Sequence, residues 1–237
     1  MAPGMMITKN MPNVSHWSLE SGYANEMSDG EYPIRAVDSG KNAAFDVVLT
    51  LLKRNFDFHC KGFDQGFRVI LSMPGEELKA TLNSLRVPIS ENSLITIKPK
   101  WITTSDGLRS YRPNQRQCFY QNERRLRFFK MYTQTNCEEE CLSNFTKLEC
   151  GCVKFSMPRD VYTTICGTAN INCYETAMRK LSTDDSPESF SATCNCIPAC
   201  TSIEYSTSID HIKFDAAAIN KIPGYKSNDS EYESYLN

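Results

Sequence analysis

The chain has 237 residues, enough for one large domain or two small ones with a sizeable hydrophobic core. Its 26 basic and 28 acidic side chains leave a net charge of −2. This near-neutral balance lacks the basic excess of proteins that bind nucleic acid through their charge, so we expect no nucleic-acid partner.

The N-terminal part shows neither a membrane-spanning segment nor a secretory signal. A helix that spans a bilayer needs about 18 to 20 consecutive apolar residues. The most apolar run, residues 43–52 (AAFDVVLTLL), is shorter and contains Asp46. Residues 1–17 have no apolar core followed by small residues. Residues 40–54 could form a helix or a strand, and their β-branched centre favours a strand.

Two further strands are predicted before residue 118. Residues 66–74 (GFRVILSMP) and 94–102 (LITIKPKWI) are rich in β-branched side chains and partly alternate with polar ones. The sequence RRLRFFK, residues 124–130, then interleaves basic and aromatic side chains. Such a run can bind RNA, but in a chain of balanced charge it is more typical of the solvated face of a helix or strand.

The cysteines are concentrated in one region. Of 11 cysteines, only Cys60 precedes residue 118, and the other ten lie between Cys118 and Cys200. Zinc sites usually contain paired C-x2-C or C-x4-C motifs or closely spaced histidines. The cluster has no C-x2-C motif and no histidine, which also argues against a catalytic thiol with a histidine base. Disulfides are the favoured interpretation, with an intracellular zinc protein as a weaker one, and Cys60 is left unpaired.

Residues 137–150 are predicted to form a helix. Asn136 is a suitable N-cap, and the carboxylates of Glu138–Glu140 in the first turn would interact favourably with the positive end of the helix dipole. One helix face would carry Cys137, Cys141, Phe145 and Leu148. In the sequence CNCIPAC, Cys194 and Cys196 would point to the same side of an extended segment. We therefore predict a two-rung disulfide ladder between this helix and that segment.

The C-terminal third completes the predicted organisation. Residues 173–181 favour a second short helix, residues 182–189 a polar surface loop, and residues 203–209 a half-buried strand. Three glycosylation sequons, which begin at Asn13, Asn144 and Asn228, favour an extracellular surface. The pattern predicts one α+β ectodomain: a β-rich region, a helical disulfide region and a strand that returns to the β-rich part.

The spacing Y-x4-C-x3-C-x8-C-x-C from Tyr132 to Cys152, followed by ICG, Cys173 and CNCIPAC, resembles the thumb of the degenerin/epithelial sodium channel family. Upstream, GFRVILSMP, residues 87–111 and RQC resemble the palm of the insect pickpocket branch, as do WSLESGY and YPIRA. The resemblance covers nearly the whole chain. It implies an antiparallel β palm and β-ball region beside a helical thumb stapled by disulfides. The implied regions are 1–65 (remainder of the finger and upper palm), 66–117 (palm and β-ball strands), 118–200 (thumb) and 201–237 (returning palm strand and knuckle).

The resemblance also implies five disulfides in the thumb. The implied pairs are Cys118 with Cys200, Cys137 with Cys196, Cys141 with Cys194, Cys150 with Cys173, and Cys152 with Cys166. Members of the family have two membrane-spanning helices that flank this ectodomain, and the second helix contains the pore. The sequence shows neither helix, so we expect a fragment or truncated product that stops before the second one. The partner of Cys60 would then lie in the missing N-terminal part.

The sequence departs from acid-sensing members at two positions. Glu175 occupies the first thumb carboxylate position, but the second, one turn later, is Arg179. A tryptophan that contacts the wrist in those members is replaced by Gln115. We therefore expect no proton gating by that route. Glu140 and Lys147 also differ from many members, and we expect both to face solvent.

The resemblance implies the extracellular part of an amiloride-sensitive sodium channel subunit at the plasma membrane. Its partners would be sibling subunits in a homo- or heterotrimer, with sodium ions passing through the missing pore. The alternative is a secreted, disulfide-rich binding module or soluble decoy without channel activity. We expect no enzyme and no cofactor, because the sequence shows no activated nucleophile, phosphate loop or convincing acid/base pair.

Overall fold

A computed structural model describes residues 17–20, 22–23, 38–49, 65–78, 84–182 and 190–213. Within these ranges, no helix is long and apolar enough to cross a bilayer. Helices and antiparallel strands are both present, which confirms the mixed α and β composition that the sequence predicts. The tail after residue 213, the loop at 183–189, Cys60, Asn13 and Asn228 lie outside the described residues.

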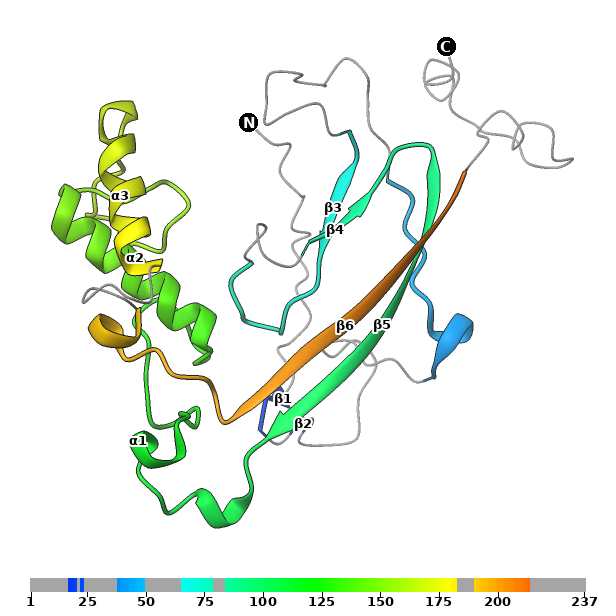
Figure 1. Cartoon of the computed structure of the whole chain (residues 1–237), viewed down its shortest axis with the longest axis horizontal. Helices are drawn as coiled ribbons and strands as arrows, with labels where there is room; N and C mark the ends of the chain where they lie inside the picture. The colour runs from blue at the N-terminus through cyan, green and yellow to red at the C-terminus, as the bar shows by residue number, and fades with distance from the viewer. Residues whose placement is uncertain are drawn as a thin grey trace, which may run out of the picture. The chain divides into compact units, whose positions relative to one another are not determined.

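The chain divides into two compact units. We call residues 1–71, 80–98 and 206–237 the sheet unit, and residues 72–79 and 99–205 the helical unit. The two longest strands, β5 (Glu91–Thr103) and β6 (Thr201–Lys213), each contain a unit boundary. They pair as a two-stranded antiparallel ribbon (Figure 1). Strand β5 includes the strand predicted at 94–102, and β6 includes the strand predicted at 203–209; both extend beyond the predicted bounds.

The sheet unit also contains two short hairpins. Strand β1 (Trp17–Ser18) pairs with β2 (Gly22–Tyr23), and β3 (Phe67–Ile70) pairs with β4 (Ser84–Val87). The strand predicted at 66–74 therefore ends at residue 70. The next residues form a turn in which the Glu76 N–H donates to the Met73 carbonyl at 3.1 Å, with Gly75 at a φ of +80°.

The strand predicted at 40–54 is wrong over its described part. A 3-10 turn spans Gly40–Ala43, and residues 44–49 have no regular structure. Phe45 and Val48 are 90% and 86% exposed. A strand is stabilised by a neighbouring strand and a buried face, and this segment has neither among the described residues.

The helical unit is built from three α-helices: α1 (Pro113–Arg116), α2 (Gln134–Cys150) and α3 (Ile171–Ser182). Short 3-10 turns cover Asp106–Leu108 and Thr168–Asn170, and a π-helical turn covers Phe190–Cys194. The second helix predicted at 173–181 is confirmed and is slightly longer. Figure 1 shows α2 and α3 packed side by side.

Helix α2 begins earlier than predicted. Its N-cap is Thr133, whose hydroxyl accepts a hydrogen bond from the Asn136 N–H, so the prediction that Asn136 caps the helix is wrong. The first turn contains no acidic residue, because Glu138–Glu140 lie one turn further along. The helix ends at Gly151, which has the left-handed φ of 69° that favours glycine at this position.

The hydrophobic core of the helical unit consists of small clusters. One contains Phe119, Tyr132, Cys137 and Cys196, a second contains Leu142, Val153, Met157 and Leu181, and a third contains Cys118, Tyr120 and Cys200. Leu148 was predicted to share the buried face of α2, but it is 84% exposed. The buried face of α2 includes Leu142 instead, which packs in the second cluster and was not part of the predicted face.

Candidate functional site: the disulfide-bonded helical unit

Five disulfides hold the helical unit together, and their Cα–Cα distances range from 4.9 to 6.1 Å. They join Cys118 to Cys200, Cys137 to Cys196, Cys141 to Cys194, Cys150 to Cys173, and Cys152 to Cys166. These are the pairs that the family resemblance implies. With every one of these sulfurs bonded to another cysteine, the structure offers zinc no thiolate from this cluster.

The segment opposite α2 is not the extended strand that the sequence predicts. Cys194 ends the π-helical turn, and Asn195 has a left-handed φ of 49°. The local bend replaces the simple alternation of a strand. Two disulfides still connect α2 to this segment, but Cys194, which bonds to Cys141, lies at the end of a helical turn and not in a strand.

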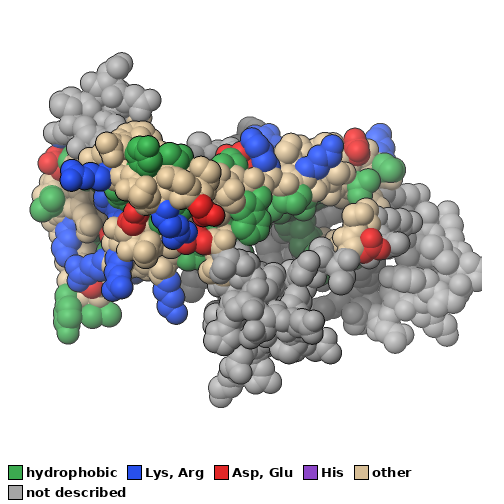
Figure 2. All heavy atoms as spheres, turned by 90° about the horizontal axis from the view of Figure 1, so that it is seen from below, with side chains coloured by type: hydrophobic (Ala, Val, Ile, Leu, Met, Phe, Trp, Pro, Cys, Tyr) green, Lys and Arg blue, Asp and Glu red, His purple; other side chains and the backbone are tan. Residues whose placement is uncertain are grey.

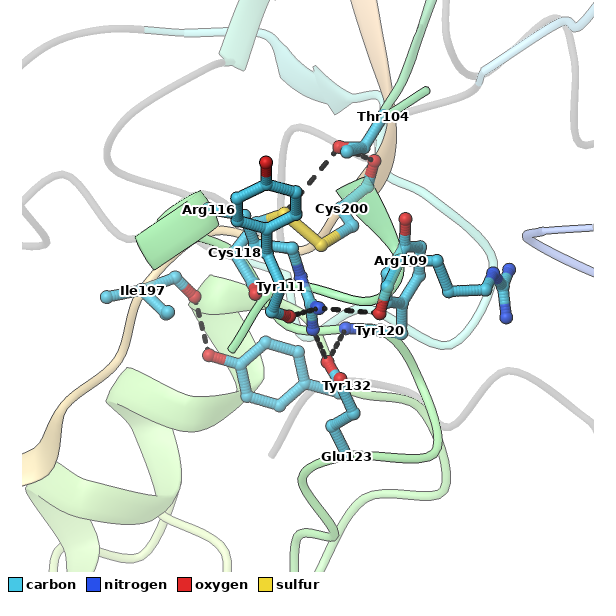
Figure 3. The surroundings of a disulfide bond; sticks show 10 residues. All are labelled: Thr104, Arg109, Tyr111, Arg116, Cys118, Tyr120, Glu123, Tyr132, Ile197 and Cys200. Atoms are coloured by element: carbon cyan, nitrogen blue, oxygen red, sulfur yellow. Dashed lines mark hydrogen bonds and ion pairs between the residues drawn. A yellow bond between two sulfur atoms is a disulfide. The ribbon is translucent and has the colours of Figure 1, made fainter. Parts of the chain in front are cut away.

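The outermost bond, Cys118–Cys200, joins the two ends of the disulfide-bonded region at residues 118–200. We call residues 118–120 its entry segment and residues 194–200 its exit segment. Phe119 connects the two sides through its backbone, because its N–H donates to the Pro198 carbonyl and its carbonyl accepts from the Cys200 N–H, both at 2.9 Å. The Thr104 hydroxyl donates to the Cys200 carbonyl at 3.0 Å (Figure 3). The entry and exit segments are therefore held together by a covalent bond and by hydrogen bonds.

Arg116 organises the loop beneath this disulfide. Its side chain is 0% exposed and forms an ion pair with Glu123. Its Nε donates to the Cys118 carbonyl at 3.2 Å, and other donors reach the carbonyls of Arg109 and Tyr111 (Figure 3). A buried guanidinium is costly unless its donors are satisfied. Here one carboxylate and three carbonyls satisfy them.

Tyr120 adds an aromatic surface to this ion pair. The guanidinium groups of Arg116 and Arg109 lie 4.5 and 4.4 Å from the centre of its ring, close enough for cation–π attraction. The Tyr120 N–H also donates to the Glu123 carboxylate at 2.8 Å. Burial by itself would raise the pKa of Glu123. The hydrogen bonds from Arg116 and Tyr120, together with the charges of Arg116 and Arg109, outweigh burial and lower that pKa below its ordinary value.

Tyr132 connects the start of α2 to the exit segment. Its ring is 1% exposed and packs edge-on against Phe119, with 5.3 Å between the ring centres. Its hydroxyl donates to the Ile197 carbonyl at 2.5 Å. Burial raises the pKa of Tyr132 to about 12, the negative charge of Glu138 adds to this effect, and the positive charge of Arg124 opposes it.

Asn136 fixes a second segment against α2. It is 0% exposed, and its carboxamide contacts three backbone groups: it donates to Gly75 and Met131 and accepts from the Glu77 N–H. A Cβ added to Gly75 would lie 3.0 Å from the Met131 sulfur, so the turn and the start of α2 are closely packed. Asn136 therefore holds the turn at residues 73–76 in place.

A family model, "Amiloride-sensitive sodium channel", matches residues 12–237. The chain belongs to the amiloride-sensitive sodium channel family. Three fruit-fly proteins of this family are similar to it. Pickpocket protein 28 of Drosophila melanogaster is 27% identical over 192 residues, which cover 80% of this chain and 31% of that protein. Pickpocket protein 11 of the same species is 24% identical over 173 residues, covering 73% of this chain and 33% of that protein.

The third relative, sodium channel protein Nach of Drosophila virilis, is 23% identical over 184 residues, which cover 74% of this chain and 44% of that protein. The chain thus spans between 31% and 44% of the length of these relatives. These matches confirm the resemblance to the degenerin/epithelial sodium channel family and to its pickpocket branch.

The positions at which the resemblance implies a difference from acid-sensing members are exposed. Glu175 and Arg179 both face solvent on α3, and Arg179 donates to the Thr176 hydroxyl at 3.2 Å. Gln115 lies on α1, where its side chain accepts a hydrogen bond from the Arg112 N–H. Asn144 is exposed on α2. The structure therefore does not bring Glu175 to the buried ion pair of Arg116 and Glu123.

Two positions that were expected to face solvent have specific contacts. The Glu140 carboxylate accepts hydrogen bonds from the Arg127 and Phe128 N–H groups at 2.6 and 2.8 Å, so the expectation for Glu140 is wrong. Lys147 is exposed but donates to the Thr163 hydroxyl at 3.0 Å.

From the sequence, neither Arg116 nor Glu123 is predicted to belong to the site, and Asn136 is predicted only to cap a helix. The motif RQC placed Arg116 next to a cysteine, but only the fold shows that its side chain is buried.

Proposed function

We propose that this chain forms an extracellular portion of a sodium channel subunit at the plasma membrane. The observation that carries the proposal is the family match over residues 12–237. The five disulfides and the Asn144 sequon, exposed on α2, favour an oxidising, extracellular environment. In this proposal the β-rich regions correspond to the palm and β-ball, and residues 118–200 correspond to the thumb.

The helical unit has the properties of a rigid lever. Disulfides join α2 to α3 and to the exit segment, and the entry and exit segments meet at Cys118–Cys200. Such a body moves as a whole when its base moves, one of the established routes of channel and receptor switching. In the proposed assembly, a homo- or heterotrimer with sibling subunits, this movement opens the sodium pore.

The test uses the natural transcript that encodes these 237 residues, expressed in oocytes alone and with a pickpocket subunit. We expect an amiloride-sensitive sodium current, surface labelling of an epitope near residue 162, and a glycosidase-sensitive mass shift that Asn144→Gln reduces. Asn13→Gln and Asn228→Gln test the other two sequons. A product that is secreted into the medium and never alters a sodium current would instead support the alternative, a secreted binding module or decoy.

A further inference from the structure

A shallow, basic pocket lies in the loop between Tyr120 and α2. It has a volume of about 410 Å³, within the range of binding sites for small ligands. Its walls are formed by Gln121, Asn122, Arg124, Arg125, Leu126, Phe129 and Lys130. We refer to it as the loop pocket. Figure 2 shows several Lys and Arg side chains close together on the helical unit, in the face turned to the viewer.

The lining contains three cations and no carboxylate. Arg124 is already engaged, because its guanidinium donates to the Cys194 carbonyl at 2.7 Å and lies 5.5 Å from the centre of the Phe119 ring. Arg125 and Lys130 are exposed, and neither has an ion-pair or hydrogen-bond partner among the residues that the structure describes. The pocket therefore presents two available positive charges.

Three carboxylates, those of Glu123, Glu140 and Asp160, are engaged in other contacts. Glu123 is paired with Arg116 and accepts from the Tyr120 N–H, while Glu140 accepts from two backbone N–H groups of the loop. Asp160 is bound by Arg127 at 3.1 Å and by the Thr163 hydroxyl at 2.7 Å. Neutralisation of Arg125 and Lys130 by Glu123, Glu140 or Asp160 would therefore require existing contacts to break.

The loop is fixed in place before any ligand arrives. The Gln121 carboxamide donates to the Tyr132 carbonyl at 2.7 Å and accepts from the Tyr132 N–H at 2.8 Å. Glu140 holds the Arg127 and Phe128 N–H groups on the other side. A preformed site avoids much of the entropy cost of ordering a loop on binding.

The chemistry of the walls selects the kind of anion. Leu126 packs against the core cluster around Tyr132, and Phe129 is half-buried, so apolar surface lies beside the two cations. Acidic peptides combine a carboxylate with apolar side chains, whereas sulfated glycans and nucleic acids offer no matching aliphatic group. The net charge of −2 further disfavours a long polyanion. We infer that the loop pocket binds an acidic peptide segment of a partner protein, with a carboxylate at Arg125 and Lys130 and an apolar side chain against Leu126 and Phe129. This inference does not depend on the channel function proposed above.

The test measures binding of a capped Leu-Asp-Glu-Phe peptide to the oxidised 237-residue chain at low ionic strength, by calorimetry and by NMR of the Asn122 and Gln121 side-chain amides. We expect saturable binding that weakens about tenfold in the double variant Arg125→Gln, Lys130→Gln, because each exposed ion pair contributes up to about 1 kcal/mol. The matched control is Arg68→Gln, Lys98→Gln, which removes the same charge from two exposed residues outside the pocket and should leave the affinity unchanged.

Three outcomes would overturn the inference. The first is equal binding of the neutral peptide Leu-Asn-Gln-Phe. The second is an equal loss of affinity in the two double variants. The third is binding of a sulfated heparin tetrasaccharide while the acidic peptide does not bind, which would identify the site as one for a sulfated glycan.

Discussion

The carboxamide nitrogen of Asn136 donates a hydrogen bond to the carbonyl of Gly75 at 2.9 Å, although 61 residues separate them in the sequence. The oxygen of the same carboxamide accepts from the Glu77 N–H at 2.8 Å. Because Asn136 is 0% exposed, water has no access to replace either bond. The Asn136 side chain therefore satisfies backbone groups in and beside the turn at residues 73–76 that would otherwise have no hydrogen-bond partner.

The variant Asn136→Ala is expected to lose about 3 kcal/mol of unfolding free energy, because it leaves buried backbone donors and acceptors unpaired. The measurement is urea unfolding of the oxidised chain, followed by far-UV circular dichroism. Asn114→Ala, at an exposed position on α1, should change the unfolding free energy by less than about 0.5 kcal/mol. Equal losses in the two variants would show that the buried carboxamide has no special role.

Removal of the Tyr132 hydroxyl has a predictable cost. Tyr132→Phe leaves the Ile197 carbonyl without its donor and should lower the unfolding free energy by about 1 to 2 kcal/mol. Tyr162→Phe is the matched control, because Tyr162 is 94% exposed. If both substitutions prove neutral in denaturant unfolding, the hydrogen bond from Tyr132 does not contribute to stability.

The pKa of Tyr132 also predicts behaviour in alkali. An unfolded tyrosine ionises near pH 10, whereas the folded pKa is raised to about 12. The folded state keeps its proton while the unfolded state loses it, so stability falls as pH rises from about 10 toward 12. Burial also raises the pKa of Tyr205, so we expect late-ionising tyrosines in the ultraviolet titration of the native chain, of which Tyr132→Phe removes one. A native titration identical to that of the variant would contradict the assignment.

Glu123 predicts the opposite response in acid. Its folded pKa lies below its ordinary value, so its contribution to stability is complete above the unfolded pKa of about 4.3 and is lost as pH falls through the folded pKa. Glu123→Gln should therefore be less stable than the parent chain at pH 7, and the difference should shrink toward pH 3. Glu204→Gln, which disrupts only an exposed pair with Lys100, serves as the control. A difference that does not vary with pH would exclude this ionic contribution.

The stabilisation by each disulfide is not expected to follow the number of residues that separate its two cysteines. Cys118 and Cys200 are 82 residues apart, which for an isolated bond corresponds to a stabilisation of about 4 to 5 kcal/mol. However, Cys137–Cys196 already closes most of that span. Removal of the outer bond by two Cys→Ser substitutions should thus cost only about 3 kcal/mol, close to the cost for Cys152–Cys166, which spans 14 residues. Peptide mapping under non-reducing conditions verifies the remaining bonds, and a loss near 5 kcal/mol would show that the nested bonds act independently.

The sequence predicts the elements whose signals are local. The cysteine spacing, the apolar pattern of α3 and the alternation of β6 all depend on residues close together in the chain, and these elements are present. The start of α2 was misplaced because two capping residues compete. Asn136 has the right residue type, but a turn 61 residues away occupies its side chain, while Thr133 performs the capping.

The parts that could not be predicted depend on contacts between distant segments. The motif RQC gives no sign that Arg116 is buried, since an arginine is usually exposed. Its burial depends on Glu123, on the Tyr120 ring and on three carbonyls that converge only in the folded loop. Residues 44–49 show the converse, because β-branched side chains favour a strand locally but find no neighbouring strand among the described residues.

The ladder between α2 and the exit segment has a consequence for biosynthesis. Cys137 and Cys141 leave the ribosome 59 and 53 residues before their partners. At a synthesis rate of about 5 residues per second, both thiols wait on the order of ten seconds. In the same interval Cys150, Cys152, Cys166 and Cys173 emerge and can bond with one another. Early closure of those two inner bonds removes four competing thiols, so vectorial synthesis itself favours the native pairing of the ladder.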